Sequence, residues 1–213
     1  MKPILHNVFD ERFRLPCFPL VTGQTVSYLG NFATMDLCGG DDGYSEKGYS
    51  RRYEVRTNGQ HSGTTNITIN GKTIAMENDV VLDKRTGLMW MRHTPDSDIG
   101  PTNDGKLYWK DGANDEHIFK FCHEANKNSL GGFCDWRVPN YHELTSILDL
   151  GQFSPCIDAT VFPGCPSDYF WVSSTRPDNP SQAFIVNFST GPVGYNTKAV
   201  FTYYCRLCRN AVM

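Results

Sequence analysis

Two cysteines near the end of the chain stand at a spacing that can bind metal or carry redox chemistry. Cys205 and Cys208 form a C-x-x-C pattern. A structural zinc site normally takes its ligands from two such pairs, and the sequence contains no second pair. The surrounding segment is rich in strand-forming residues, and residues three apart on a strand point to opposite sides. We therefore expect each sulfur to have a separate disulfide partner, rather than zinc or dithiol redox chemistry.

The whole chain contains 8 cysteines, an even number that allows every one of them to be paired. Cys156 and Cys165 bracket a short proline-containing loop and suit a local bridge, while Cys17 and Cys38 could close an N-terminal arm or crosslink subunits. No secretory signal peptide is visible, because charged residues from position 10 onwards interrupt the N-terminal apolar stretch. Two interpretations stay open: cysteines oxidised after synthesis, as in a phage particle released by lysis, or reduced cysteines that pack as small apolar side chains.

Acidic residues gather in two loops. The stretch at 96–100 resembles the start of a calcium loop, but an EF-hand would need a glutamate where Leu107 stands. We expect no cofactor, and keep open only an irregular calcium site, the alternative being solvated loop acids. Its candidate ligands are Asp41, Asp42, Asp96, Asp98 and Asp104.

Histidines and hydroxyl residues do not form a catalytic set by their spacing. His117 and Cys122 are five residues apart, so they do not share one face of a helix well. His142 has no nucleophile beside it, and the hydroxyl residues at 173–175 have no positioned base. We therefore predict neither a metal site on the first helix nor a hydrolase triad.

The charge balance of the 213-residue chain bears on its partners. Lys+Arg is 20 and Asp+Glu is 23, a formal net charge of -3. That balance argues against nucleic acid or an anionic membrane surface as a bulk electrostatic partner. No apolar run is long enough for a transmembrane helix, so we expect no membrane insertion.

The elements that must position these residues divide the chain into three parts. Residues 1–50 read as an irregular arm with several prolines and a Gly-rich acidic run. Residues 51–79 form a lead-in with a β-hairpin, whose turn is set by Asn70 and Gly71. Residues 80–213 form an α+β domain with one helix at about 114–126 and a second that begins at Asn140, where Glu143 completes a capping box. Strands dominate from Phe170 onwards, ending with a run at 200–207.

Several segments together resemble one family. They are D-x-x-T-G-L-M-W at 83–90, G-x-x-D-W-R-V-P-N-x-x-E-L at 132–144, F-W-V-S-S-T at 170–175 and the terminal Cys208-Arg209. This set is similar to the Lcl C-terminal domain family, named after a collagen-like bacterial adhesin, over roughly residues 80–209. The resemblance implies a C-type-lectin-like fold with two helices and a twisted antiparallel sheet. We interpret Trp136 and its charged neighbours Asp135 and Arg137 as fold determinants that form ion pairs with other loops.

The resemblance also implies where a ligand and a disulfide would lie. In lectin-like folds the cysteine of the first helix commonly bonds the last strand, which by analogy pairs Cys122 with Cys208. Ligands usually bind at long loops beyond the second helix. The calcium-lectin motifs are missing here, so calcium-dependent sugar binding is disfavoured. The candidate ligand-binding residues in those loops are Arg176, Asp178, Asn179, Tyr195, Asn196 and Lys198.

The leading functional hypothesis is a non-enzymatic recognition module displayed on a virion or extracellular surface. We expect a phage particle or tail component that binds a host glycan or surface protein and forms a homo-oligomer, with a trimer favoured, or contacts neighbouring virion proteins. The alternatives are a structural virion protein locked by its arm and disulfides, a bacterial surface adhesin, and, more remotely, an enzyme of the formylglycine-generating type, whose fold is related.

Overall fold

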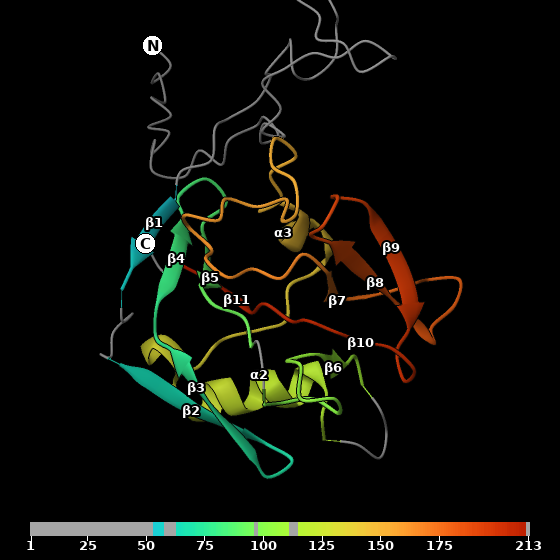
Figure 1. Cartoon of the computed structure of the whole chain (residues 1–213), viewed down its shortest axis with the longest axis horizontal. Helices are drawn as coiled ribbons and strands as arrows, with labels where there is room; N and C mark the ends of the chain where they lie inside the picture. Colours follow the sequence, from blue (N-terminus) through green and yellow to red (C-terminus); the bar gives the residue numbers. More distant parts are fainter. Residues whose placement is uncertain (1–52, 58–62, 96–97, 111–114, 212–213) are drawn as a thin grey trace, which may run out of the picture.

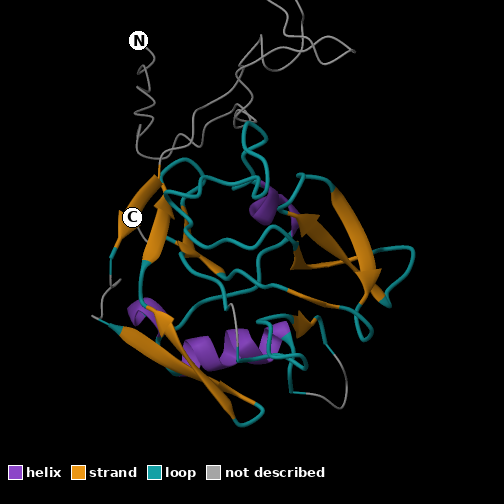
Figure 2. Ribbon diagram, in the orientation of Figure 1, coloured by secondary structure: helices purple, strands orange, loops and turns teal. Residues whose placement is uncertain are grey.

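The structure is a computed structural model that describes residues 53–57, 63–95, 98–110 and 115–211. It confirms the mixed α+β class, with two α-helices and several antiparallel sheets in the described residues (Figures 1 and 2). The predicted arm at 1–50 lies outside the described residues, together with Cys17, Cys38, Asp41 and Asp42. None of the described helices is long and apolar enough to cross a membrane.

The elements follow one another in this order: β1 (Tyr53–Arg56), β2 (Thr64–Ile69), β3 (Lys72–Glu77), β4 (Val80–Asp83), β5 (Leu88–Met91), β6 (Leu107–Tyr108), α2 (Ile118–Lys127), the 3-10 helix η2 (Leu130–Gly132), α3 (Tyr141–Thr145), β7 (Tyr169–Thr175), β8 (Gln182–Asn187), β9 (Val193–Thr197), β10 (Thr202–Tyr203) and β11 (Cys208–Asn210).

A four-stranded sheet in the order β1-β4-β5-β11 forms one side of the domain. Every residue of β4 and β5 is buried, so this hairpin reads as a continuous apolar run rather than an alternating one. Its turn is held by Asp83, which accepts hydrogen bonds from the Thr86 hydroxyl at 2.7 Å and the Arg85 amide at 2.9 Å. The last strand, β11, returns to pair with β5 and sets Cys208 opposite Trp90.

The β2–β3 hairpin belongs to the same core as the helices. The predicted turn is confirmed, because Asn70 and Gly71 both have positive φ, at 49° and 76°. Ile67 and Ile69 of β2 are fully buried in one cluster with Ile118 and Phe121 of α2. Figure 1 shows this hairpin beside α2, so the lead-in packs directly onto the α+β domain.

The motif at 132–144 fastens the centre of the fold. The Trp136 indole is buried and donates to the Leu130 carbonyl at 2.8 Å. Asp135 accepts two hydrogen bonds from Arg209, at 2.6 and 3.1 Å, and Arg137 donates to Glu143 at 2.5 Å. The prediction that these charged neighbours pair with other segments is therefore confirmed.

Three local predictions need correction. The first helix starts at Ile118 with His117 as its N-cap, since the His117 imidazole accepts from the Lys120 amide. The second helix has the predicted capping box but ends at Thr145, well before Gly151, because the chain there goes into successive turns. Of the single strand expected at 200–207, only β10 (Thr202–Tyr203) is a strand; an irregular segment follows, in which Arg206 turns inward to the Met91 carbonyl, and the last strand, β11, begins at Cys208.

Candidate functional site

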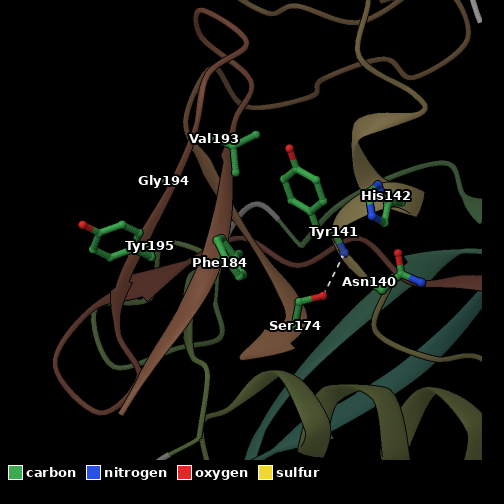
Figure 3. A pocket seen from close by; sticks show the side chains of 8 residues that line it. All are labelled: Asn140, Tyr141, His142, Ser174, Phe184, Val193, Gly194 and Tyr195. Atoms are coloured by element: carbon green, nitrogen blue, oxygen red, sulfur yellow. Dashed lines mark hydrogen bonds between the residues drawn. The ribbon is translucent and has the colours of Figure 1, made fainter. Parts of the chain in front are cut away.

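A groove lies between the start of α3 and one face of the sheet β7-β8-β9 (Figure 3). Its cavity volume is about 580 Å³. Aromatic and apolar side chains dominate the lining, and the polar groups come mainly from the N-terminal end of α3 and the end of β7. The lining residues are Asn140, Tyr141, His142, Ser174, Phe184, Val193, Gly194 and Tyr195.

The α3 wall is fixed by polar contacts at the N-terminus of this short helix. The Asn140 side chain accepts from the Glu143 amide at 2.9 Å, and the Glu143 carboxylate accepts from the Asn140 amide at 2.8 Å. The next amide, that of Tyr141, donates to Ser174 Oγ of β7 at 3.1 Å. A further bond from the Ser173 amide to the Pro139 carbonyl, at 2.8 Å, joins the same two segments. These bonds set where the Tyr141 ring stands relative to the sheet.

The opposite wall comes from cross-strand neighbours in the sheet. Phe184 of β8 faces Tyr195 of β9 directly in the strand register, so both rings lie on one face. Across the groove, the Tyr141 ring lies 5.8 Å from the Phe184 ring. Tyr195 remains 48% exposed and Val193 36% exposed, although both are large apolar side chains.

An ion pair holds the outer face of Tyr195. The Arg176 guanidinium lies 3.8 Å from the centre of the Tyr195 ring. It donates to both carboxylate oxygens of Asp178, at 2.6 and 2.7 Å, and to Gln182 Oε1 at 2.9 Å. Hydrogen bonding from Arg176 lowers the pKa of Asp178, so this carboxylate stays ionised under mildly acidic conditions. Arg176, Asp178 and Gln182 thus form one preassembled cluster against the Tyr195 ring.

The structure brings together only part of the predicted ligand set. Arg176, Asp178 and Tyr195 meet as described, but Asn196 lies on the other face of the sheet, where its amide donates to the Tyr203 hydroxyl at 2.7 Å. Lys198 also points away from the groove. Its ammonium donates to Thr175 Oγ1 at 2.8 Å and lies 3.9 Å from the centre of the Trp109 ring.

The remaining predicted residue, Asn179, forms hydrogen bonds within its own turn. Its side-chain oxygen accepts from the Ser181 hydroxyl at 2.7 Å, and its backbone N–H donates to the Arg176 carbonyl. Tyr141 and Phe184 are groove residues that the sequence reasoning missed. The signal for Tyr141 was its position directly after the helix cap, whereas Phe184 stood in an apolar run at 183–186 whose two faces the sequence does not distinguish.

A second, more polar hollow of about 470 Å³ lies across β9 from the groove. It is lined in part by Tyr169, Asn187, Asn196 and Tyr203. Burial raises the pKa of the Tyr203 hydroxyl, so this group stays protonated and can both donate and accept hydrogen bonds. Strand β9 therefore separates an aromatic groove from a hydrogen-bonding hollow.

The predicted disulfides are not formed among the described cysteines, all of which are free thiols. Each sulfur lies near a different partner. Cys122 donates to the Trp136 carbonyl, whereas the Cys208 sulfur lies 3.1 Å from the Arg137 guanidinium. Likewise, the Cys156 thiol is directed to the Ser189 carbonyl and the Cys165 thiol to that of Pro166.

The C-x-x-C thiols are poor nucleophiles in this environment. Burial raises the pKa of Cys208 to about 12 and that of Cys205 well above its usual value. Because the thiolate is the reactive and metal-binding form, both groups are inert at neutral pH. Within the described ranges no three His, Cys, Asp or Glu side chains gather as metal ligands. Of the candidate calcium ligands in those ranges, Asp104 instead accepts from the Lys106 amide at 3.1 Å.

The arrangement offers stacking and hydrogen bonding to a bound molecule. Aromatic faces with few rotatable bonds contact a ligand at low entropic cost, and a small number of polar groups fix its orientation. Tyr141 and Tyr195 supply both an apolar ring and a hydroxyl, and Ser174 and His142 add polar atoms at the rim.

Comparisons with known proteins agree with this architecture. The family model of the Lcl C-terminal domain matches residues 79–209, which include both walls of the groove. This domain is found in collagen-like adhesin-type proteins and is generally non-catalytic. Neither the curated proteins nor the solved structures contain a match to the chain. Since the matched segment spans more than half of the chain and holds most of its buried core, the chain belongs to the Lcl C-terminal domain family.

Proposed function

We propose that this protein is a non-enzymatic recognition module that binds a host glycan or surface protein in the groove between α3 and β9. The observation that carries the proposal is Tyr195, a large aromatic side chain that is 48% exposed yet held in place by Arg176. An exposed ring fixed in this way loses little conformational freedom when a ligand stacks on it. The occurrence of the domain in adhesin-type proteins supports the same function.

The chemistry of the groove favours a ligand with both apolar and hydroxyl-bearing surfaces. Its walls are rings and aliphatic side chains, which suit the C–H faces of a sugar or the apolar side chains of a protein. The Arg176 guanidinium beside Tyr195 is already paired with Asp178, and no Lys or Arg is among the described residues that line the groove, which disfavours an anionic polysaccharide. We therefore propose a neutral rather than a sulfated ligand.

Display on a virion, most specifically a phage particle or tail, or on another extracellular surface is the setting we propose for this module. A recognition groove has use only where it meets its ligand, and the domain is found in adhesin-type proteins. Mass spectrometry of purified particles and of host envelope fractions tests the location. Recovery only in the cell interior would contradict it.

Binding to an array of bacterial surface glycans, followed by titration of any hit, tests the groove. Tyr195→Ala is expected to remove binding, and Tyr195→Phe to retain most of it, because the ring is the contact surface. Tyr169→Ala is the matched control, since Tyr169 is similarly exposed but lines the hollow on the other face of the sheet. Equal losses from Tyr195→Ala and Tyr169→Ala, with unchanged thermal unfolding, would contradict the assignment of the groove.

A further inference from the structure

The free edge of strand β9 exposes a defined set of backbone groups. Strand β9 pairs only with β8 in the described sheet β7-β8-β9. At the two ends of that ladder, the Asn187 amide donates to the Pro192 carbonyl and the Lys198 amide donates to the Ser181 carbonyl, each at 3.0 Å. Hydrogen-bonding direction alternates along an antiparallel strand. The backbone N–H and C=O groups of the even-numbered β9 residues therefore point to β8, and those of the odd-numbered residues point outward from the sheet edge.

Two of the outward-facing residues have no partner for their backbone groups. Thr197 is satisfied locally, since its amide donates to the Asn196 side chain and its carbonyl accepts from the Val200 and Phe201 amides. Val193 and Tyr195 have no such bonds within the part of the chain that the structure describes. Each of these two residues therefore presents one free N–H and one free C=O at the edge.

The edge also lacks the features by which proteins usually block strand pairing. Edge strands are commonly protected by charged side chains, by an internal proline or by a bulge. The sequence of β9 is VGYNT, with neither a charge nor a proline, and its ladder with β8 is regular over all five residues. Such an edge is a template for one more strand.

The two hollows beside β9 indicate what that strand must look like. An added strand continues the sheet, so its side chains alternate between the aromatic groove on one face and the polar hollow on the other. Strand β9 has this alternation itself: Val193 and Tyr195 lie on the groove face, whereas Gly194 and Asn196 lie on the polar face.

We propose that the occupant of this edge is β9 of a second copy of the chain, so that the protein forms a two-fold symmetric dimer. An antiparallel pair related by an axis perpendicular to the sheet keeps the same face of both copies on the same side. Val193 and Tyr195 of the second copy then lie beside the groove of the first, and Asn196 of the second copy lies beside the hollow of the first. The result is one continuous sheet with three strands from each copy.

One register uses every free backbone group. With Gly194 on the two-fold axis, Val193 of each copy lies opposite Tyr195 of the other, and their N–H and C=O groups form reciprocal hydrogen bonds. The residue on the axis forms a pair without hydrogen bonds, where the backbones approach most closely. Glycine suits that position, and its partner there is Gly194 of the second copy.

The dimer has a consequence for recognition. Because the axis is perpendicular to the joined sheet, both α3–β9 grooves open on the same side, and a ligand with repeated units can engage both. The dimer goes beyond the proposed function and does not depend on it, since it forms without ligand. The proposal has two copies where the sequence favoured a trimer, because an antiparallel edge contact closes with two copies.

Light scattering and sedimentation of the full chain, from micromolar to hundreds of micromolar, test the proposal directly. Gly194→Glu and Gly194→Lys each place like charges across the axis and are expected to shift the protein to monomer. Neither should disturb the fold, because a Cβ at Gly194 meets Ile185 side-chain atoms only at ordinary contact distances of 3.6 and 3.7 Å. An equimolar mixture of the two variants should restore the dimer, since opposite charges then face each other.

Two further variants complete the test. Gly194→Ala is the neutral control and should remain dimeric. Val193→Pro removes the outward N–H without touching the ladder to β8, and it should weaken dimerisation several-fold. A wild-type monomer or trimer, or a failure of the mixed charge variants to recover the dimer, overturns the proposal. Because none of these measurements uses a ligand, their outcome leaves the test of the groove at Tyr195 separate.

Discussion

Glu143 supports the candidate site through two separable interactions, and its substitution should reveal both. Its carboxylate accepts from the Asn140 amide at 2.8 Å, which completes the capping box of α3. The same oxygen accepts from the Arg137 guanidinium at 2.5 Å. Glu143→Gln keeps an acceptor for the cap and removes the charge, whereas Glu143→Ala removes both. The two variants therefore divide the contribution of this side chain to the free energy of unfolding.

The magnitudes follow from exposure and geometry. The Arg137 side chain is 37% exposed and that of Glu143 is 19% exposed, so the ion pair lies between the surface and the interior. We expect Glu143→Gln to cost about 1 kcal/mol, at the upper end of the range for exposed pairs. Loss of the helix cap adds about 1 kcal/mol, so Glu143→Ala should cost about 2 kcal/mol. In a domain of this size, each 1 kcal/mol lowers Tm by roughly 2–4 °C.

Urea unfolding followed by circular dichroism, with Tm from calorimetry, measures these differences. Arg137→Gln is the matched partner variant: combined with Glu143→Gln, it should cost less than the sum of the two single changes, because the pair is broken only once, while the Arg137 bond to Asn210 at 2.9 Å is lost in both the single and the double variant. Two results would refute the reasoning. One is an equal cost for Glu143→Gln and Glu143→Ala, which would mean that the cap contributes nothing. The other is full additivity of the two glutamine variants, which would mean that the ion pair contributes nothing.

Three further predictions concern other parts of the domain. Hydrogen bonding from Arg209 lowers the pKa of Asp135, so this pair stabilises the fold at neutral pH, and its contribution is lost as pH falls through the lowered pKa. Asp135→Asn should therefore flatten the acid side of a plot of unfolding free energy against pH. An unchanged acid side would contradict the pairing. Trp136→Phe should cost about 1–3 kcal/mol in urea unfolding, because the buried Leu130 carbonyl loses its donor; a cost below that of a typical surface change would argue against this bond. Cys134 is the exposed thiol among the described cysteines. In a Cys17→Ser/Cys38→Ser background it should react fast with Ellman's reagent in the native state, and Cys134→Ser should remove that phase; fast labelling that persists there would contradict the shielding of the other described thiols.

The scaffold of the fold was predictable because its signals are local. The capping box at Asn140 and Glu143 needs only two residue types three positions apart, and the Asn70-Gly71 turn needs only backbone freedom. The motif around Trp136 was also interpreted correctly as structural. In each case the sequence itself contains both partners or a spacing that restricts where they lie.

The candidate site was predicted only in part because its walls meet through long-range contacts. Tyr141 and Phe184 are far apart in the chain, and only the docking of α3 on β8 brings their rings together. Asn196 and Lys198 were grouped with Tyr195 because they are neighbours in sequence. A strand, however, sends adjacent side chains to opposite faces, so Asn196 could have been excluded from the groove by that rule alone.

The cysteine pairings illustrate a different limit. An even count allows disulfides, but it does not place the sulfur atoms near one another. In the structure Cys208 is instead buried in one apolar cluster, and Cys122, partly buried, packs against the other. Reduced cysteines that pack as small apolar side chains are the second of the two interpretations left open from the sequence, and this interpretation describes Cys122 and Cys208.

The two walls of the groove differ in how freely they can change over evolutionary time. The α3 wall is anchored by the capping box of Asn140 and Glu143, so substitutions of these two residues cost the fold stability. Tyr195 and Val193 project from an edge strand and remain substantially exposed, so their replacement costs the fold little. A chain of this fold can therefore change what it binds through substitutions along β9, while the anchored α3 wall keeps its place.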